Sequence, residues 1–139
     1  MSLSAFLRQN SLTRENIKTA VSRRFLEDGK PAMWELRALT EDEHSRIRDA
    51  STKIITVKGR PEQKFERSLY LKRLCAAAVV YPDLKNAELQ KSYGVTGGED
   101  LIGVMLLPGE FNDLLEAVQE QNGFDAESAE EDREEIKNS

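Results

Sequence analysis

The stretch MLLPGEFNDLLEAVQEQNGF, residues 105–124, decides the fold because it specifies one helix at both ends and along one face. Pro108 suits the first turn of a helix, where its missing N–H costs nothing, and Glu110 places a carboxylate at the positive end of the helix dipole. Gly123 can adopt the left-handed conformation of a Schellman cap, which turns Phe124 back toward the helix. One apolar stripe follows the helix, formed by Phe111, Leu114, Leu115 and Val118. The sequence therefore predicts a helix over residues 108–122 on which the upstream chain packs.

The composition is that of a small soluble domain with a large exposed surface. The chain has 139 residues, of which 32% are charged and 39% are apolar. The apolar run at residues 76–81 is far too short to span a bilayer, and the N-terminus lacks the pattern of a secretory signal. Cys75 is the single cysteine, so no internal disulfide can form, and we expect a protein of the reducing cytoplasm.

Charge is unevenly distributed along the chain. The net charge is −5, and residues 125–139 carry seven acidic and two basic side chains, so residues 1–124 are neutral overall. This distribution lacks the basic footprint of a nucleic-acid-binding protein. We therefore divide the chain into an N-terminal arm over residues 1–16, one globular domain over residues 17–124 and an acidic tail that we predict to be disordered.

The arm carries Leu3, Phe6 and Leu7 on one side of a short helix that Ser4 could cap. A helix of this length is not stable alone in water. The arm either docks on the domain or becomes ordered only on a partner protein. Its three apolar residues are therefore candidate partner-binding residues.

Residues 17–39 show the alternation of apolar and polar residues that is typical of a β-hairpin with one buried face. Asp28-Gly29 between the two halves is a type I′ turn signal. With these two residues as the loop, Glu27 faces Lys30. Pro31 removes one backbone donor, so the turn could be longer than two residues.

The same register places Val21 opposite Leu36, and Arg23 opposite Trp34 as a cation–π pair. Trp34 is then either the core of the hairpin or, if nothing covers it, part of a binding surface. We take Arg23, Trp34 and Leu36 as further candidate partner-binding residues. An uncovered hairpin edge or the apolar arm could also pair two copies of the chain.

The rest of the chain predicts helices and a possible third strand. Thr40 and Glu43 form a capping box, and residues 53–58 form a possible strand that Gly59-Arg60-Pro61 ends. The predicted helices cover residues 41–50, 62–81, 86–93, 99–106 and 108–122, and the second of them is the central buried helix. The predicted fold class is α+β and predominantly helical, with a small antiparallel sheet packed on a helical C-terminal half.

No constellation of residues indicates catalysis, a cofactor or a metal site. Gly94, Gly97 and Gly98 do not form a phosphate-binding loop, and no cysteine–histidine spacing fits a zinc site. Cys75, in mid-helix, is expected to be a structural thiol. His44 lies among charged residues and is expected to be solvated.

An ordered series of short motifs gives the chain its most specific signal. The motifs are VSRRF at 21–25, EDGKP at 27–31, WELRALT at 34–40, VKGRP at 57–61, AVVYP at 78–82, AELQKSYG at 87–94, EDL at 99–101 and MLLPGEF at 105–111. In this order they resemble the XkdN-like family of phage tail assembly chaperones, and the likeness covers most of the chain outside its two ends.

The resemblance implies a non-enzymatic helper of tail assembly in a tailed phage or prophage. Such a protein is expected to bind the tape measure protein in the host cytoplasm, keep its apolar helices from aggregating, help recruit tail tube protein and be absent from the mature particle. The alternatives are a structural tail component or connector that stays in the particle, and a small adaptor that binds a helix.

The resemblance also implies a longer product made by ribosomal frameshifting near the end of the gene. Ile136-Lys137-Asn138 permits a −1 slip on a heptamer of the type A-AAA-AAY. As a hypothesis, the acidic tail links the domain to a frameshifted extension. Sequencing the gene tests it, since the site is lost if Ile136 is not encoded by ATA or Lys137 is not encoded by AAA.

Overall fold

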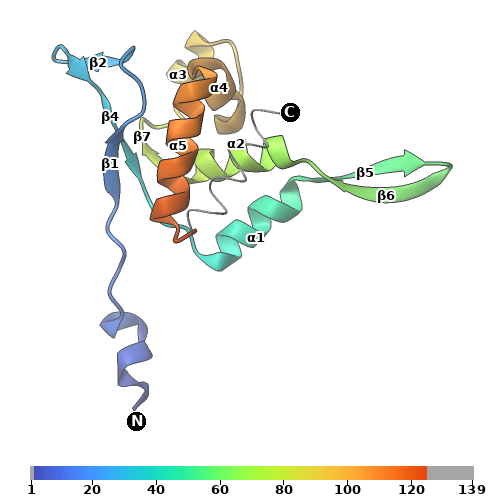
Figure 1. Cartoon of the computed structure of the whole chain (residues 1–139), viewed down its shortest axis with the longest axis horizontal. Coiled ribbons are helices and arrows are strands. Elements are labelled where there is room, and N and C mark those ends of the chain that lie inside the picture. The colour runs from blue at the N-terminus through green and yellow to red at the C-terminus, as the bar shows by residue number, and fades with distance from the viewer. Residues whose placement is uncertain (1, 125–139) are drawn as a thin grey trace.

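The computed structural model describes residues 2–124, and Figure 1 shows the order of its elements. The helices are α1 (Glu41–Ala50), α2 (Arg67–Ala78), α3 (Ala87–Ser92), α4 (Gly98–Met105) and α5 (Pro108–Gln121), with short 3-10 turns at Leu3–Phe6 and Arg8–Asn10. The strands are β1 (Ile17–Ala20), β2 (Leu26–Glu27), β3 (Lys30–Pro31), β4 (Met33–Leu36), β5 (Thr52–Val57), β6 (Arg60–Phe65) and β7 (Val79–Tyr81). The α+β class is confirmed. Helices take 46% and strands 22% of the described residues, so the predicted predominance of helix is confirmed only in part.

The central sheet has three antiparallel strands in the order β1-β4-β7. Its third strand is β7, not residues 53–58 as the sequence suggested. The helix predicted to reach residue 81 ends at Ala78, because Val79 adopts an extended conformation and Pro82 keeps Tyr81 out of the helical region. The apolar residues 79–81 therefore form an edge strand of the central sheet and not the last turn of the helix.

The predicted hairpin is present, but its register is confirmed only at the tip. Glu27 pairs with Lys30 in the short β2–β3 ribbon, as predicted. Below the tip, Thr19 lies opposite Trp34, so the expected pairing of Arg23 with Trp34 is wrong. Ile17, not Val21, faces Leu36.

The register changes because the unpaired segments on the two sides of the hairpin differ in length. Residues 21–25 lie between β1 and β2, whereas only Ala32 lies between β3 and β4. The hydroxyl oxygen of Ser22 accepts a hydrogen bond from the N–H of Arg24 at 3.0 Å, which bends the chain locally. The N–H of Ala32 donates to the carbonyl of Phe25 at 2.7 Å and rejoins the two strands. The hairpin is therefore divided into a wide base in the central sheet and a separate two-stranded tip.

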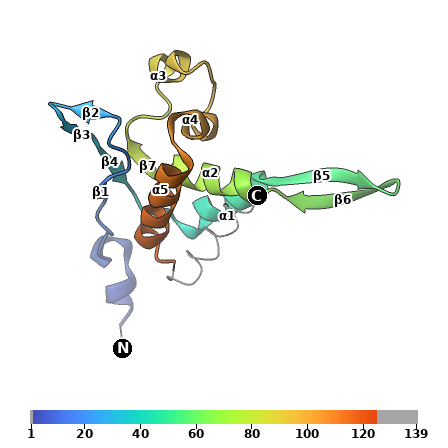
Figure 2. The same cartoon turned by 45° about the horizontal axis from the view of Figure 1, so that its top comes forward.

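A second hairpin, β5–β6, extends away from the body (Figures 1 and 2). The predicted helix over residues 62–81 is wrong in its first part, because residues 60–65 form β6 and the helix begins at Arg67. Lys58 and Gly59 have φ angles of 52° and 77°, the left-handed pair of a type I′ turn. Gly59 therefore lies in the turn after β5, and Arg60-Pro61 begins the next strand, β6.

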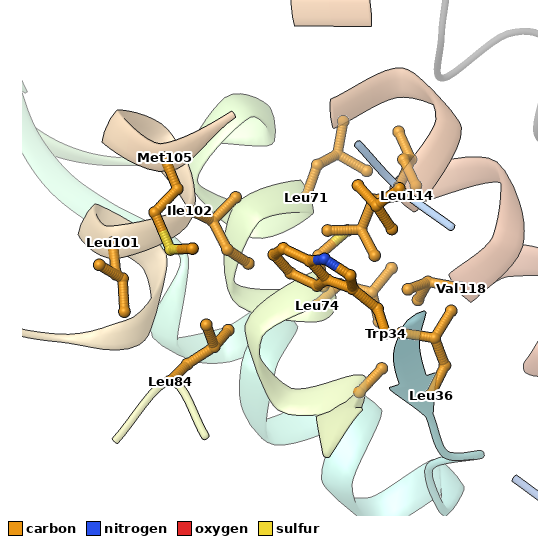
Figure 3. Close-up of a cluster of buried hydrophobic side chains, with 14 of the residues drawn as sticks. Trp34, Leu36, Leu71, Leu74, Leu84, Leu101, Ile102, Met105, Leu114 and Val118 are labelled. Atoms are coloured by element: carbon orange, nitrogen blue, oxygen red, sulfur yellow. The ribbon is translucent and has the colours of Figure 1, made fainter. Parts of the chain in front are cut away.

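The core lies between the central sheet and the helices α2, α4 and α5 (Figure 3). Trp34 and Leu36 point from β4 to the same side and are 1% and 0% exposed. The buried side chains around them are Leu71, Leu74, Leu101, Ile102, Met105, Leu114, Leu115 and Val118. Cys75 is also fully buried, which raises the pKa of its thiol and keeps it protonated, so the expected structural role fits its position.

The local signals for the helices α1 and α5 are confirmed, and the helices predicted over residues 86–93 and 99–106 are present as α3 and α4. Thr40 and Glu43 form the predicted capping box on α1. Pro108 is the first residue of α5, and the N–H groups of Gly123 and Phe124 donate to the carbonyls of Glu120 and Gln119, the two bonds of a Schellman cap.

His44 is not the solvated residue that its charged neighbours suggested. Its side chain is 17% exposed. The Nε2 atom lies 2.5 Å from the hydroxyl oxygen of Tyr70, and the ring packs edge-on against Phe124 with centroids 5.7 Å apart. The Schellman cap places Phe124 there, so His44 helps fix the end of α5 against α1.

Candidate protein-interaction surfaces

The N-terminal arm presents apolar side chains that the fold does not use. Phe6 is 82% exposed and Leu12 is 99% exposed, and Leu3 and Leu7 are also exposed. Figures 1 and 2 show the arm extending beyond one end of β1. Three of the six sequence-predicted binding residues, Leu3, Phe6 and Leu7, therefore lie together on an open surface.

The arm has a few polar hydrogen bonds of its own and is joined to the body at its base. Within the arm, the amide nitrogen of Asn10 donates to the carbonyl of Ser4 at 2.7 Å. At its base, the guanidinium of Arg14 donates to the carbonyl of Glu120 at 3.0 Å, and the amide of Gln121 donates to the carbonyl of Glu15 at 2.7 Å. These bonds orient the arm without covering its apolar residues.

The other three predicted binding residues do not share this surface. Trp34 and Leu36 lie in the core and are almost fully buried. Arg23 is exposed, but the changed register leaves it away from Trp34. It is the neighbouring Arg24 whose guanidinium lies over an aromatic ring, 5.0 Å from the centre of Phe25.

An apolar groove that the sequence did not reveal lies between the β2–β3 tip and the helices α3 and α4. Its volume is about 190 Å³. Its walls are formed by Phe25, Leu26, Glu27, Ala32, Met33, Trp34, Tyr81, Pro82, Leu89 and Met105. The one sequence signal for this groove is Phe25-Leu26, two adjacent apolar residues that interrupt the alternation of apolar and polar positions in the strand.

A charged cluster holds the base of the β2–β3 tip to α5. The hydroxyl of Ser22 donates to Glu110 Oε2 at 2.5 Å, and Arg24 donates to both carboxylate oxygens, at 2.5 and 3.1 Å. Arg24 also donates to the carbonyl of Met105 at 2.7 Å. Arg24, followed by Ser22 and the N–H of Leu107, lowers the pKa of Glu110 to about 2, so the carboxylate stays charged at neutral pH.

This cluster gives two of the sequence motifs a structural reason. VSRRF supplies Ser22 and Arg24, and MLLPGEF supplies Glu110. The motifs are distant in sequence and meet at one wall of the apolar groove, because Met105 and Phe25 also line it. The cluster therefore joins the two segments that carry Phe25 and Met105.

Other kinds of site are absent from the part of the chain that the structure describes. Across residues 2–124, no group of histidine, cysteine and acidic side chains comes together as metal ligands would. Within the same range, no helix has both the length and the apolar content needed to cross a bilayer.

Comparison with known proteins places the chain in a family. Among solved structures it is similar to the crystal structure of the protein YqbN, a structural genomics target, with 23% identity and a TM-score of 0.77 over 90% of this chain and 98% of that one. That likeness shows a shared fold. No curated protein matches the chain. The sequence model of the family described as phage XkdN-like tail assembly chaperone protein matches residues 3–137, nearly the whole chain. The chain therefore belongs to the family of phage XkdN-like tail assembly chaperones.

Proposed function

We propose that this chain binds the tape measure protein in the host bacterial cytoplasm and keeps it soluble until the tail tube forms around it. In this proposal it helps recruit tail tube protein and is absent from the mature particle. The family supports a role in tail assembly. The observation that carries the proposal is the arm, whose apolar side chains are left exposed by the rest of residues 2–124.

A chaperone of this kind needs exposed apolar surface and high solubility in the same molecule. The arm supplies apolar surface on a short helical segment whose 3-10 turns alone cannot be stable in water. An apolar helix of the tape measure protein would cover Leu3, Phe6 and Leu7 and order the arm on binding. The net charge of −5 over residues 125–139 would keep loaded complexes apart in solution.

Co-expression with the tape measure protein tests the arm directly. Phe6→Ser combined with Leu7→Ser should reduce the co-purified tape measure protein at least about 10-fold, the loss expected for about 1.4 kcal/mol of binding free energy. Val104→Ser is the matched control, because Val104 is an exposed apolar residue on α4, outside the arm. Equal co-purification with both variants would exclude the arm as the binding surface.

Mass spectrometry of purified particles tests the fate of the chain. The proposal requires that the chain be missing from mature particles while the tube protein is abundant. A stoichiometric amount in the particle would instead identify a structural tail component. The frameshift hypothesis at Ile136-Lys137-Asn138 lies outside the described residues and is decided by the codons of the gene.

A further inference from the structure

The β5–β6 hairpin is an isolated two-stranded ribbon with both faces in solvent. Figure 2 shows it projecting from the body, and all six residues of β6 are exposed. Ile54 in β5 is 76% exposed. A two-stranded ribbon is at best marginally stable in water and gains stability when a further strand or another chain covers it.

The two outer edges of this ribbon can be told apart from its hydrogen-bond pattern. The N–H of Glu66 donates to the carbonyl of Ser51 at 2.8 Å, so Ser51 and Glu66 are a hydrogen-bonded pair. Since such pairs alternate along an antiparallel ladder, the backbone groups of residues 53, 55 and 57 face β6. The backbone groups of Thr52, Ile54 and Thr56 therefore face outward.

One edge is open to pairing and the other is blocked. The outward-facing residues of β6 are Pro61, Gln63 and Phe65, and Pro61 has no N–H to donate. The outward-facing residues of β5 all carry both groups and include β-branched side chains that favour strands. Among residues 2–124, no strand pairs with either outer edge.

We propose that β5 pairs antiparallel with β5 of a second copy, about a two-fold axis at Ile54. This register pairs every outward-facing residue of the strand, with Ile54 opposite Ile54 and Thr52 opposite Thr56. It places Lys53 opposite the uncharged Ile55. A shift of the axis to Lys53 would set two lysines face to face, which is unfavourable, and would leave an outward residue unpaired.

The blocked edge of β6 sets the size of the assembly. A ribbon with two open edges would add strands without limit, whereas one open edge per copy gives a closed pair. The result is a four-stranded sheet in the order β6-β5-β5-β6 with Pro61 on each outer edge. This pairing does not depend on the arm or on the tape measure protein, so its experimental test is independent of the proposed function.

Sedimentation equilibrium of the full chain, with two proline variants, tests the pairing. Ile54→Pro and Gln63→Pro each replace an outward-facing N–H and leave the bonds inside the hairpin intact. We expect a wild-type dimer, a dissociation constant raised at least about 10-fold by Ile54→Pro, and little change with Gln63→Pro. A monomeric wild type, or equal effects of the two variants, would overturn the proposal.

A cysteine cross-link tests the register without disturbing the backbone. In a hydrogen-bonded pair the Cα atoms are about 5.5 Å apart, within the range of a disulfide. Ile54→Cys should therefore form a covalent dimer on mild oxidation, and Gln63→Cys should not. Cys75 does not interfere, because it is buried. Failure of Ile54→Cys to cross-link, or equal cross-linking of both variants, would contradict the two-fold axis at Ile54.

Discussion

At the scale of single residues, Glu110 connects parts of the chain that are far apart in sequence. Its carboxylate accepts hydrogen bonds from Ser22 and Arg24 and from the N–H of Leu107, which caps the first turn of α5. The side chain is only 15% exposed. Hydrogen bonds to a charged group that is largely shielded from solvent are among the stronger polar contacts in a protein.

Glu110→Gln should lower the free energy of unfolding at pH 7 by about 1–2 kcal/mol, since the amide keeps the size of the side chain but loses the charge. The folded pKa of about 2 lies below the ordinary value of 4.5. The stabilisation is therefore present above pH 4.5 and is lost as the pH falls toward 2. Urea unfolding at pH 7 and pH 3 checks this: the difference between variant and wild type should shrink at pH 3. Glu120→Gln, on the same helix, is the control, and an equal effect there would contradict a specific role of Glu110.

Trp34→Ala should destabilise the protein by about 3–5 kcal/mol, because it leaves a large cavity in the core. The substitution therefore tests stability and not partner binding, although the sequence made Trp34 a candidate partner-binding residue. Met33→Ala is the matched control, since Met33 is the neighbouring residue on the exposed face of β4 and should cost less than about 1 kcal/mol. Thermal unfolding of both variants measures the contrast, and similar losses would show that Trp34 is not the centre of the core.

At the scale of elements, the sequence predicted what local signals specify and missed what distant contacts specify. The ends of α1 and α5 follow from a capping box, a first-turn proline and a Schellman glycine, all within a few residues of the helix ends. The register of the β1–β4 pair depends on Ser22, whose partner Glu110 is 88 positions away in the sequence. The sequence does not predict the strand β6, because its residues are exposed on both faces and show no alternation of apolar and polar positions.

The candidate binding residues divide in the same way. The sequence left open whether Leu3 and Phe6 dock on the domain or stay exposed, because a short apolar segment that is not stable alone permits both, and the structure leaves them exposed. The alternation of apolar and polar residues in β4 did not predict that Trp34 is buried. Alternation identifies the two faces of a strand but not which face the helices cover. The apolar groove arises only when the β2–β3 tip and α3 are brought together.

Gly109 in α5 and Gly123 just beyond its end should respond oppositely to the same substitution. Gly109 lies in the first turn with open space around it, so Gly109→Ala should stabilise the protein by about 0.4–1 kcal/mol. Gly123 also has open space, but its φ of +81° is unfavourable for alanine, so Gly123→Ala should cost about 1 kcal/mol. Urea unfolding measures both. The same sign for the two variants would contradict the Schellman cap at the end of α5.

At the scale of the whole molecule, the chain consists of a packed body with two projections that its core does not require. The arm leaves from one end of β1, and the β5–β6 hairpin leaves from between α1 and α2 (Figure 1). Exposed apolar side chains lie on both projections, Phe6 on the arm and Ile54 on the hairpin. The core residues all lie outside the two projections, so the projections are free to contact other chains. Under the two proposals above, the arm binds the tape measure protein and the hairpin binds a second copy.

This division predicts that the stability of the body and the binding of partners can be separated. Removal of residues 2–12 should change the free energy of unfolding by less than about 0.5 kcal/mol, because the deleted side chains are exposed and Arg14 and Gln121 keep their contacts at the base. The same deletion should abolish co-purification of the tape measure protein. It should leave the self-association of the isolated chain, measured by sedimentation, unchanged. Urea unfolding, pull-down and sedimentation of one preparation measure all three. A loss of stability would show that the arm belongs to the body, and a change in sedimentation would show that the arm, not β5, joins two copies.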